Sequence, residues 1–292
     1  MANVNYAAEY SRALANAYPY LSYYGRIWAS NNSNLYKPGM GKTMYIPSLE
    51  VSGAHAVNRD QITGTFNRNW DNALQAVSLQ MDREWDTLVD PMDIDETNMV
   101  ASIANITKTF VEQQKVPEMD AFLSTVLYAA VTPDTTALTA ANILTTWDGY
   151  LESLANARVN RDRVVAYMDP GTYKLLKEAA GLTRFVDTGS GIRGVDRNVA
   201  RLDGVELVEV PADLMKSSYS FTTGWVAATG AKQIHMILVD PEAVAAPVKY
   251  ETAMVSAPTA QSKGKYLYYE RYYYGAFALN NRKGGIIVNA ES

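Results

Sequence analysis

The pattern of apolar residues between positions 93 and 130 predicts two consecutive helices. Asp93 and Glu96 have the spacing of a capping box, which satisfies free backbone N–H groups where a helix starts. The apolar residues that follow share one helical face, at steps of four, three and four: Met99, Ile103, Ile106 and Phe110. Pro117 is expected to end this long helix, because proline has no N–H to donate. The next helix carries a second apolar stripe: Met119, Phe122, Leu123, Val126 and Leu127.

Residues 38 to 90 are expected to form a protruding β-hairpin. Residues 43 to 47 predict one short strand, and a polar tip follows between Gly53 and Gly64. Apolar and polar positions then alternate, with Ala73, Val77, Leu79 and Met81 on one face and Ser78, Gln80 and Asp82 on the other. Because a lone hairpin is only marginally stable in water, this one would gain most by lying on a neighbouring subunit.

Residues 137 to 245 alternate between helical and strand patterns, which predicts an α/β subdomain. Thr139 is positioned to cap a helix whose buried stripe is Ile143, Trp147, Leu151 and Leu154. Further expected elements are strands at 163–168, 205–210 and 233–239 and a helix at 170–180. The C-terminal part returns to β structure, with a tyrosine-rich strand at 265–274 and a last strand at 286–288.

The composition favours a protein with large interfaces. The chain has 292 residues, of which 48% are hydrophobic and only 20% are charged, and it holds 20 Tyr against 6 Phe. Tyrosine suits surfaces that are apolar at one end and polar at the other, so its excess points to interfaces, with a tyrosine-rich β core as the alternative. Residues 1 to 37 form an expected N-terminal arm, in which Tyr6, Tyr10 and Tyr20 would lie on another surface, with an ordinary N-terminal helix as the alternative.

Charge and residue counts exclude several classes of function. The net charge of -5 argues against a protein that tracks nucleic-acid phosphates, although it allows a shell whose wall faces nucleic acid. With no Cys and only two His, His55 and His235, the chain has no thiol nucleophile, no cysteine-ligated zinc and no histidine-rich metal site. No targeting segment and no membrane-spanning run is visible. We expect no cofactor.

Three motifs suggest chemistry, and each has a simpler interpretation. Residues 39–43 contain the end of a phosphate-binding loop, but Tyr36 stands where the first Gly is required, and Thr43 opens a predicted strand. Seven carboxylates lie between Asp82 and Glu96, and we expect them to face solvent at the end of a strand and to cap a helix. The alternative is a weak divalent-cation contact at a subunit junction. No GxSxG nucleophile motif accompanies either histidine.

A glycine-rich polar loop from Asp187 to Asp196, with its flanks, concentrates arginines and aspartates. Its charged residues are Arg184, Arg193, Arg197 and Arg201 together with Asp187, Asp196 and Asp203. In a monomer this loop would only be solvated. In a closed ring of subunits it would pair opposite charges between neighbours, which is the interpretation we favour because the loop is long and otherwise unexplained.

Three stretches carry a resemblance to a known family: DPMDIDETN at 90–98, PEMDAF at 117–122 and NVARLDGVELVEVP at 198–211. With the order of parts along most of the chain, they resemble the major capsid proteins of tailed bacteriophages with the Hong Kong 97-type fold, in the form common in phages of Gram-positive hosts. The resemblance implies an α+β fold with an N-terminal arm (1–37) and an extended β-hairpin loop (38–90). It further implies a peripheral domain built on a spine helix (91–136 and 246–292) and an α/β axial domain (137–245).

The resemblance also implies a structural role without catalysis. Subunits would assemble through hexamers and pentamers into an icosahedral shell around double-stranded DNA that is bound without sequence specificity, in a virion assembled in the host cytoplasm. Implied partners are a portal protein, a separate scaffolding protein (because the chain begins directly with its arm) and optional decoration proteins, with no membrane. Some relatives weld subunits through a Lys on the extended loop, but no Lys occurs between Met44 and Thr107, so such welding is not expected. The alternatives are an encapsulin-like compartment shell and, in a different class, a nucleotide-binding enzyme that uses residues 39–43.

We expect the assembly contacts to involve residues of the arm, the hairpin, the strand after it and the axial loop. They are Tyr6, Tyr10, Tyr20, Arg59, Asp60, Arg68, Trp70, Arg83, Glu84, Trp85, Arg193, Asp196, Arg197 and Arg201.

Overall fold

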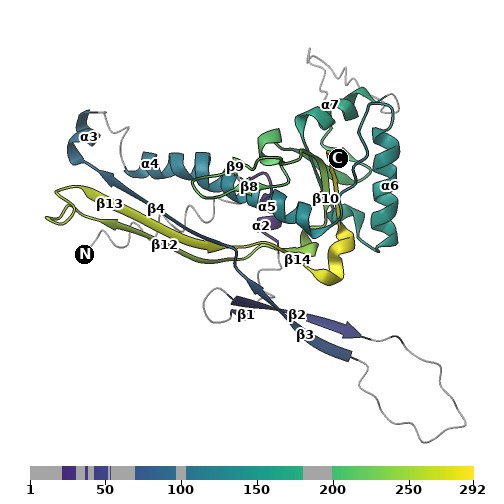
Figure 1. The fold of residues 1–292 in the computed structure, drawn as a ribbon, viewed down its shortest axis with the longest axis horizontal. Helices are drawn as coiled ribbons and strands as arrows, with labels where there is room; N and C mark the ends of the chain where they lie inside the picture. Colours follow the sequence, from purple (N-terminus) through teal and green to yellow (C-terminus); the bar gives the residue numbers. More distant parts are fainter. Residues whose placement is uncertain are drawn as a thin grey trace, which may run out of the picture.

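The computed structural model describes residues 22–30, 37–38, 43–51, 53, 70–96, 103–179 and 199–292. Helices and sheets are mixed in an elongated body, with an α/β lobe at one end and a long sheet and helix at the other (Figure 1). This is the α+β architecture expected from the sequence. The polar tip of the hairpin, most of the N-terminal arm and the axial loop lie outside the described residues.

The hairpin is present and projects away from the rest of the molecule (Figure 1). Strands β2 (Thr43–Val51) and β3 (Trp70–Ser78) pair antiparallel over their full lengths, and the short β1 (Lys37–Pro38) adds a third strand. Thr43 therefore begins a strand and not a helix, which removes the helix N-terminus that a phosphate-binding loop requires.

The second strand of the expected hairpin is in fact two strands in different sheets. After a break at Leu79 and Gln80, β4 (Met81–Val89) leaves the hairpin and pairs with β13 (Tyr266–Tyr274), which pairs with β12 (Val248–Ser256). Alternation of apolar residues continues through the break, so the sequence pattern showed no boundary. Leu79 is buried and anchors the break point.

The spine departs from expectation at both of its predicted boundaries. Asp90 and not Asp93 precedes the first helix, α3 (Pro91–Glu96), and its carboxylate accepts a hydrogen bond from the Met92 N–H at 3.0 Å. Proline favours this first helical position, because its missing N–H would have no partner there. The next described helix, α4 (Ile103–Phe110), begins a continuous spine.

Pro117 does not end the spine. A π-helical turn, η2 (Val111–Lys115), follows α4, and α5 (Val116–Ala130) continues directly with Pro117 in its first turn. In a regular helix the proline ring would clash with the carbonyl four residues earlier. The π turn immediately before Pro117 is wider than an α-helical turn and so relieves this clash. The chain therefore stays helical through the proline.

The α/β lobe is built on a five-stranded sheet in the order β15-β10-β5-β7-β6. Its strands are β5 (Val165–Met168), β6 (Arg201–Leu202), β7 (Val205–Glu209), β10 (Ile234–Val239) and β15 (Ile286–Ala290). β5 and β7 run parallel and the other pairs are antiparallel. The last strand, β15, lies in this sheet, although it comes from the C-terminal stretch that was assigned with the spine.

Each face of this sheet packs on a different layer. Helices α6 (Ile143–Asn156) and α7 (Pro170–Glu178) cover one face, and the expected stripe Ile143, Trp147, Leu151 and Leu154 is buried there. Asn142 and not Thr139 is the residue before α6, although Thr139 shares a turn with it. Helices α5 and α2 (Gly25–Trp28) cover the other face.

Short elements complete the fold: 3-10 turns η3 (Arg161–Arg163), η4 (Ala212–Leu214), η5 (Pro241–Ala243) and η6 (Asn280–Gly285), and strands β8 (Tyr219–Ser220), β9 (Val226–Ala227), β11 (Val244–Ala245) and β14 (Phe277–Ala278).

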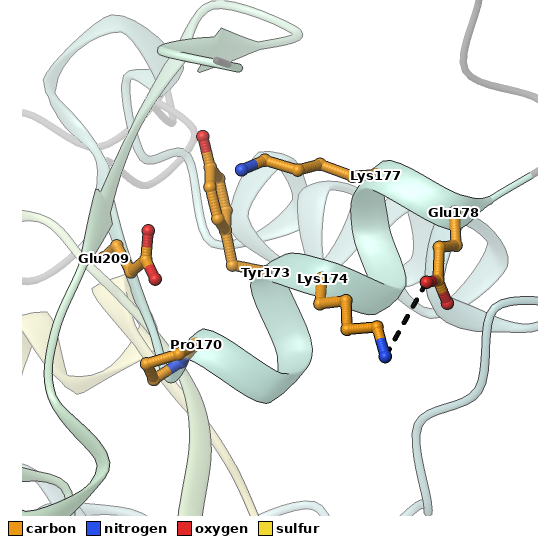
Figure 2. A pocket seen from close by; sticks show the side chains of 6 residues that line it. All are labelled: Pro170, Tyr173, Lys174, Lys177, Glu178 and Glu209. Atoms are coloured by element: carbon orange, nitrogen blue, oxygen red, sulfur yellow. Dashed lines mark ion pairs between the residues drawn. The ribbon is translucent and has the colours of Figure 1, made fainter. Parts of the chain in front are cut away.

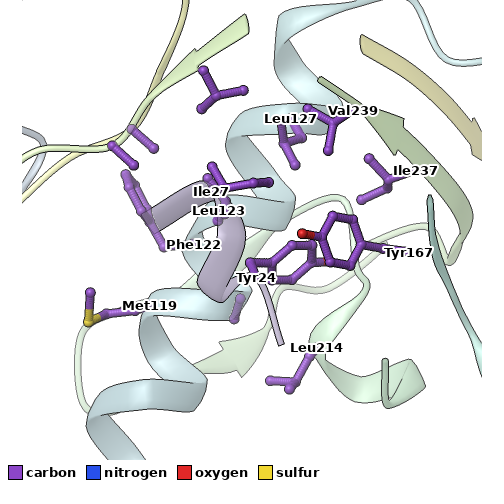
Figure 3. Packing of buried hydrophobic residues seen from close by; sticks show 14 of the residues in the cluster. Tyr24, Ile27, Met119, Phe122, Leu123, Leu127, Tyr167, Leu214, Ile237 and Val239 are labelled. Atoms are coloured by element: carbon purple, nitrogen blue, oxygen red, sulfur yellow. The ribbon is translucent and has the colours of Figure 1, made fainter. Parts of the chain in front are cut away.

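The main core lies where the N-terminal segment, the spine and the α/β sheet meet (Figure 3). Its labelled members are Tyr24, Ile27, Met119, Phe122, Leu123, Leu127, Tyr167, Leu214, Ile237 and Val239. Tyr24 packs against Tyr167 with ring centroids 4.4 Å apart. Because this core joins spine and sheet, the two parts of the elongated body share a single packed interior.

Candidate assembly surfaces

Strand β4 presents one face to the spine and the other to solvent. Along it, Met81, Arg83, Trp85 and Val89 face inward, while Asp82, Glu84, Asp86 and Leu88 are exposed. β13 follows the same alternation, so Tyr268, Glu270, Tyr272 and Tyr274 are buried beneath the spine. The outer face of the sheet therefore carries a row of carboxylates, and the inner face carries aromatic residues and charges.

Buried charges hold the spine against this sheet. Lys115 forms an ion pair with Glu270, and both side chains are 2% exposed. Tyr268 donates a hydrogen bond to Glu270 at 2.9 Å, and the Lys115 ammonium lies 4.3 Å from the centre of the Tyr272 ring. A buried charge needs such partners, because a charge without them is strongly destabilising in an apolar interior.

A second ion pair, between the half-buried Arg83 and the buried Glu118, lies one turn further along the spine. Arg83 donates to Glu118 at 2.8 Å and to the carbonyl of Phe221 at 2.6 Å, and Tyr274 donates to Glu118 at 2.9 Å. Burial lowers the pKa of Arg83, but the hydrogen bond and charge attraction of Glu118, together with the nearby Tyr272 and Tyr274, outweigh burial and leave the pKa raised. These bonds link β4, β13 and α5 to the loop after β8.

An open groove of about 460 Å³ lies beside these pairs, between β4, the spine and the loop at Thr222–Gly224. Trp85 stacks on Phe110 in its wall, with ring centroids 4.1 Å apart and planes 7° apart. Three of the residues expected at assembly contacts, Arg83, Glu84 and Trp85, line this groove together. Arg83 and Trp85 make their contacts within the subunit, whereas Glu84 is exposed and accepts a hydrogen bond from Tyr269 at 3.3 Å.

The remaining expected contact residues are distributed as follows. Arg201 lies exposed at the start of β6, on the edge of the five-stranded sheet. Trp70 begins β3, opposite Val51. The others lie outside the described residues: Tyr6, Tyr10, Tyr20, Arg59, Asp60, Arg68, Arg193, Asp196 and Arg197.

The root of the N-terminal arm is tied into the core. Asp120, 1% exposed, accepts hydrogen bonds from the Ser22 hydroxyl and from the Tyr23 N–H at 3.0 Å. The Tyr24 hydroxyl lies 2.9 Å from that of Ser124, which donates to the Leu214 carbonyl at 2.7 Å. Burial raises the pKa of Asp120 to about 7, although the hydrogen bonds from Ser22 and Tyr23 lower it.

A second concave surface, of about 340 Å³, lies on helix α7 and is lined mainly by charged side chains (Figure 2). Lys174 lies 3.9 Å from Glu178, and the Lys177 ammonium lies 3.8 Å from the centre of the Tyr173 ring. Glu209 of β7 faces them from across the hollow (Figure 2). His235 lies 3.6 Å from Asp169, which caps α7 through the Thr172 N–H.

Asp82 and Asp90, two of the acidic residues between Asp82 and Glu96, form ion pairs within the subunit. Asp82 pairs with Arg271 at 3.2 Å, and Asp90 lies 3.7 Å from Lys265 while it also caps α3. Within the part of the chain that the structure describes, no three His, Asp or Glu residues cluster closely enough to hold a metal ion. No helix in that part is both long enough and apolar enough to cross a membrane.

Sequence reasoning missed the buried charges Lys115, Glu118, Asp120 and Glu270. A signal for Glu270 was present, because it has the same even-numbered phase as Tyr268, Tyr272 and Tyr274 in a strand with one buried face. The three spine charges carry no comparable signal, since the π turn shifts the phase of the helix between α4 and α5.

Comparison with known proteins gives matches in structure only. No model of a known protein family and no curated protein sequence matches the chain. The capsid structure of the cyanophage P-SCSP1u is similar with a TM-score of 0.65 and 12% identity, over 88% of this chain and 85% of that one. The mature capsid of bacteriophage PhiM1 gives 0.61 and 14%, over 86% and 82%. A virus-like particle from Pyrococcus furiosus gives 0.50 and 10%, over 96% and 98%.

These matches cover more than four fifths of both chains, and at identities of 10 to 14% they carry information on the fold alone. Together with the hairpin, the spine and the α/β lobe described above, they show that this chain has the Hong Kong 97-type fold of tailed-phage capsid proteins.

Proposed function

We propose that this protein is the major capsid protein of a tailed bacteriophage, which assembles through hexamers and pentamers into an icosahedral shell around double-stranded DNA. The observation that carries the proposal is the similarity to phage capsid structures over more than four fifths of both chains. The projecting β2–β3 hairpin supports it, because an exposed two-stranded ribbon gains stability when a neighbouring subunit covers it.

The role is structural rather than catalytic. Subunits would join by heterologous contacts, which close into rings when the rotation between neighbours closes. The proposed contacts comprise the arm tyrosines, Arg59 and Asp60 in the hairpin tip, Arg68 after it, the exposed Glu84 and the loop that ends at Arg201. Buried pairs such as Lys115 with Glu270 keep the spine and sheet rigid while many modest contacts sum across the shell.

The proposed partners follow from the same role. They are further copies of the chain, a portal protein, a separate scaffolding protein, optional decoration proteins and packaged DNA bound without sequence specificity. The protein would reside in the virion, after assembly in the host cytoplasm.

The first test is negative-stain electron microscopy of the full chain, expressed with and without its scaffolding partner. Closed polyhedral shells, or rings of six and five subunits, are the expected result. A dispersed monomer or dimer under both conditions would overturn the proposal.

A compartment shell of the encapsulin kind is the alternative with a specific observation behind it. The virus-like particle from Pyrococcus furiosus is matched over 98% of its chain, although its TM-score of 0.50 is lower than those of the two phage capsids. Gene neighbours separate the two, since portal, terminase and scaffold genes indicate a phage and a single cargo enzyme indicates a compartment. ATP titration of the purified chain tests the nucleotide-binding alternative, and we expect no binding.

A further inference from the structure

One exposed surface of the α/β lobe is basic, although the whole chain carries a net charge of -5. Three segments form it: the residues just after α6, the turn η3 and the turn η6. Its cations are Arg158, Arg161, Arg163, Arg282 and Lys283, all of them exposed. We call this set the basic patch.

The three segments are in direct contact. A Cβ atom built on Gly284 would lie 3.0 Å from the Cβ of Ala157, so η6 packs directly against the end of α6. The Glu242 carboxylate joins η3 to η6, because it pairs with Arg163 at 2.8 Å and with Arg282 at 2.9 Å. Arg158 follows Ala157 and Lys283 precedes Gly284, so each of these two cations is next in sequence to one of the contacting residues.

Charges within the patch do not balance. Asp162, Asp240 and Glu242 are its carboxylates, and Asp240 is buried and paired with Arg163 at 3.0 Å. Arg158, Arg161 and Lys283 form no ion pair with any described residue. Three cations on neighbouring turns thus face solvent with uncompensated charge.

The backbone at Arg158 allows the effect of its charge to be tested apart from its effect on stability. Arg158 has a φ of 58° and lies directly after the Ala157 that ends α6. This position favours Gly, because the left-handed conformation costs about 1 kcal/mol for a residue with a Cβ. Lys263, outside the patch, has the same conformation, so the backbone carries no argument for function by itself, but Gly at position 158 removes the charge at no backbone cost.

We propose that the basic patch binds the phosphate backbone of double-stranded DNA, and that it therefore lies on the inner wall of the shell. This inference rests on the proposed function, since it assigns the packaged genome to one surface of the subunit. Guanidinium and ammonium groups form charge-assisted hydrogen bonds with phosphate oxygens. Contacts to phosphate carry no sequence information. The small number of cations fits a contact that holds DNA weakly.

The test uses the full chain and a fluorescent 30-base-pair duplex of random sequence, titrated at several KCl concentrations. The variant R158Q/R161Q/K283Q removes the three unpaired cations. We expect its affinity to fall by about tenfold at 50 mM KCl and its slope of log affinity against log salt to become shallower by about 2 to 3, because each phosphate contact contributes about 0.9. The control K108Q/K174Q/K232Q makes the same change of charge at exposed lysines elsewhere and is expected to change the slope by less than half as much.

Equal losses of affinity in both triple variants would show that DNA binding responds only to the net charge of the protein. That result would overturn the assignment of DNA binding to the basic patch. A wild-type chain that binds poly-glutamate but not the duplex would also overturn it, in favour of an acidic protein partner. The variant Arg158→Gly separates the contribution of Arg158 to DNA binding from its contribution to folding stability. We expect weaker DNA binding together with a melting temperature about 2 °C higher. A lower melting temperature would show that Arg158 is needed for folding and would contradict the argument from its backbone.

Electron microscopy keeps this inference distinct from the proposed function. Shells that form normally from the patch variant, with weaker DNA binding by the subunit, support both. Shells from a wild-type chain without measurable DNA binding would overturn the patch and leave the capsid proposal intact.

Discussion

Asp120 shows how a single buried carboxyl couples the arm to the core. Its hydrogen bonds to Ser22 and Tyr23 join the start of the described N-terminal segment to helix α5, and it is 1% exposed. Burial raises its pKa from 3.8 to about 7. Because the folded pKa lies above the unfolded value, the folded state holds the proton more tightly. The stabilising contribution of this group is therefore present below about pH 4 and is lost as the pH rises to 7.

We predict that the free energy of unfolding falls by about 3 kcal/mol between pH 5 and pH 8, at 1.36 kcal/mol for each pH unit up to the folded pKa. Asp120→Asn should remove most of this dependence, because an amide does not ionise. Urea denaturation of both proteins across this pH range measures the effect. Asp134→Asn serves as the control and should keep the wild-type slope, since hydrogen bonds from Tyr150 and Thr136 outweigh burial and lower the pKa of Asp134. An unchanged slope in Asp120→Asn would mean that another group titrates.

At the scale of elements, buried charges and a π turn together set how the spine lies on the sheet. Lys115 ends the π turn and pairs with Glu270 of β13, and Glu118 one turn later pairs with Arg83 of β4. A regular helix through Pro117 would place these side chains at different angles around the axis, since a π turn adds one residue. The proline, the π turn and the two ion pairs are thus parts of one arrangement.

Removing one partner of the Lys115–Glu270 pair leaves the other charge buried and unpaired. We predict that Lys115→Met lowers the free energy of unfolding by about 3 to 5 kcal/mol, and that adding Glu270→Gln recovers part of this loss. A double-mutant cycle in urea measures the coupling. Lys174→Met, at the exposed pair with Glu178, is the control and should cost under about 1 kcal/mol. Equal losses in both lysine variants would contradict the argument.

The buried face of the spine also decides which substitutions unfold it. The apolar pattern pointed to Ile103, Ile106 and Phe110, but these are only half-buried, whereas Thr107 and Val111 are 0% and 1% exposed. Ile103→Asp should therefore leave a folded subunit that is about 1 kcal/mol less stable, contrary to the misfolding that the stripe alone implies. Val111→Asp buries an unpaired charge and should cost about 4 kcal/mol or more. Circular dichroism melts of both variants distinguish these outcomes, and similar melts would contradict the assignment.

At the scale of the whole molecule, the hairpin projects beyond the main core, and among its described residues Val77 packs on the small cluster of Ala245 and Leu279. Strands β2 and β3 pair from Thr43 opposite Ser78 to Val51 opposite Trp70, and they project from the body (Figure 1). The core at the junction of α2, α5 and the five-stranded sheet does not include them. Folding of the subunit and assembly of subunits are thus separable.

Deleting residues 53–64 should give a subunit that folds but does not form shells. Its melting temperature should stay within about 2 °C of the wild type, because β2 and β3, from which the tip extends, supply no residue to the main core. Electron microscopy after expression with the scaffolding partner measures assembly. Normal shells from the deletion would contradict a role of the hairpin in contacts between subunits.

Local patterns in the sequence determined most of the elements. The stripe Ile143, Trp147, Leu151 and Leu154 is buried as expected, and the strands and helix of the α/β lobe occur close to their predicted positions. These features depend on residues that are near in sequence and on a periodicity that burial imposes directly. The Hong Kong 97-type fold followed from the order of these parts and from the resemblance of three short stretches.

Tertiary structure decided what depends on partners distant in sequence. The division of one alternating stretch between two sheets required β13, some 190 residues away, and the entry of β15 into the five-stranded sheet required β10. The continuation of the spine through Pro117, the buried pairs of Lys115 and Glu118, and the basic patch at Arg158 and Lys283 likewise arise where distant segments meet. Hydrophobic periodicity tells which face of an element is buried, but only the packed chain sets which segment covers that face and which charges it brings together.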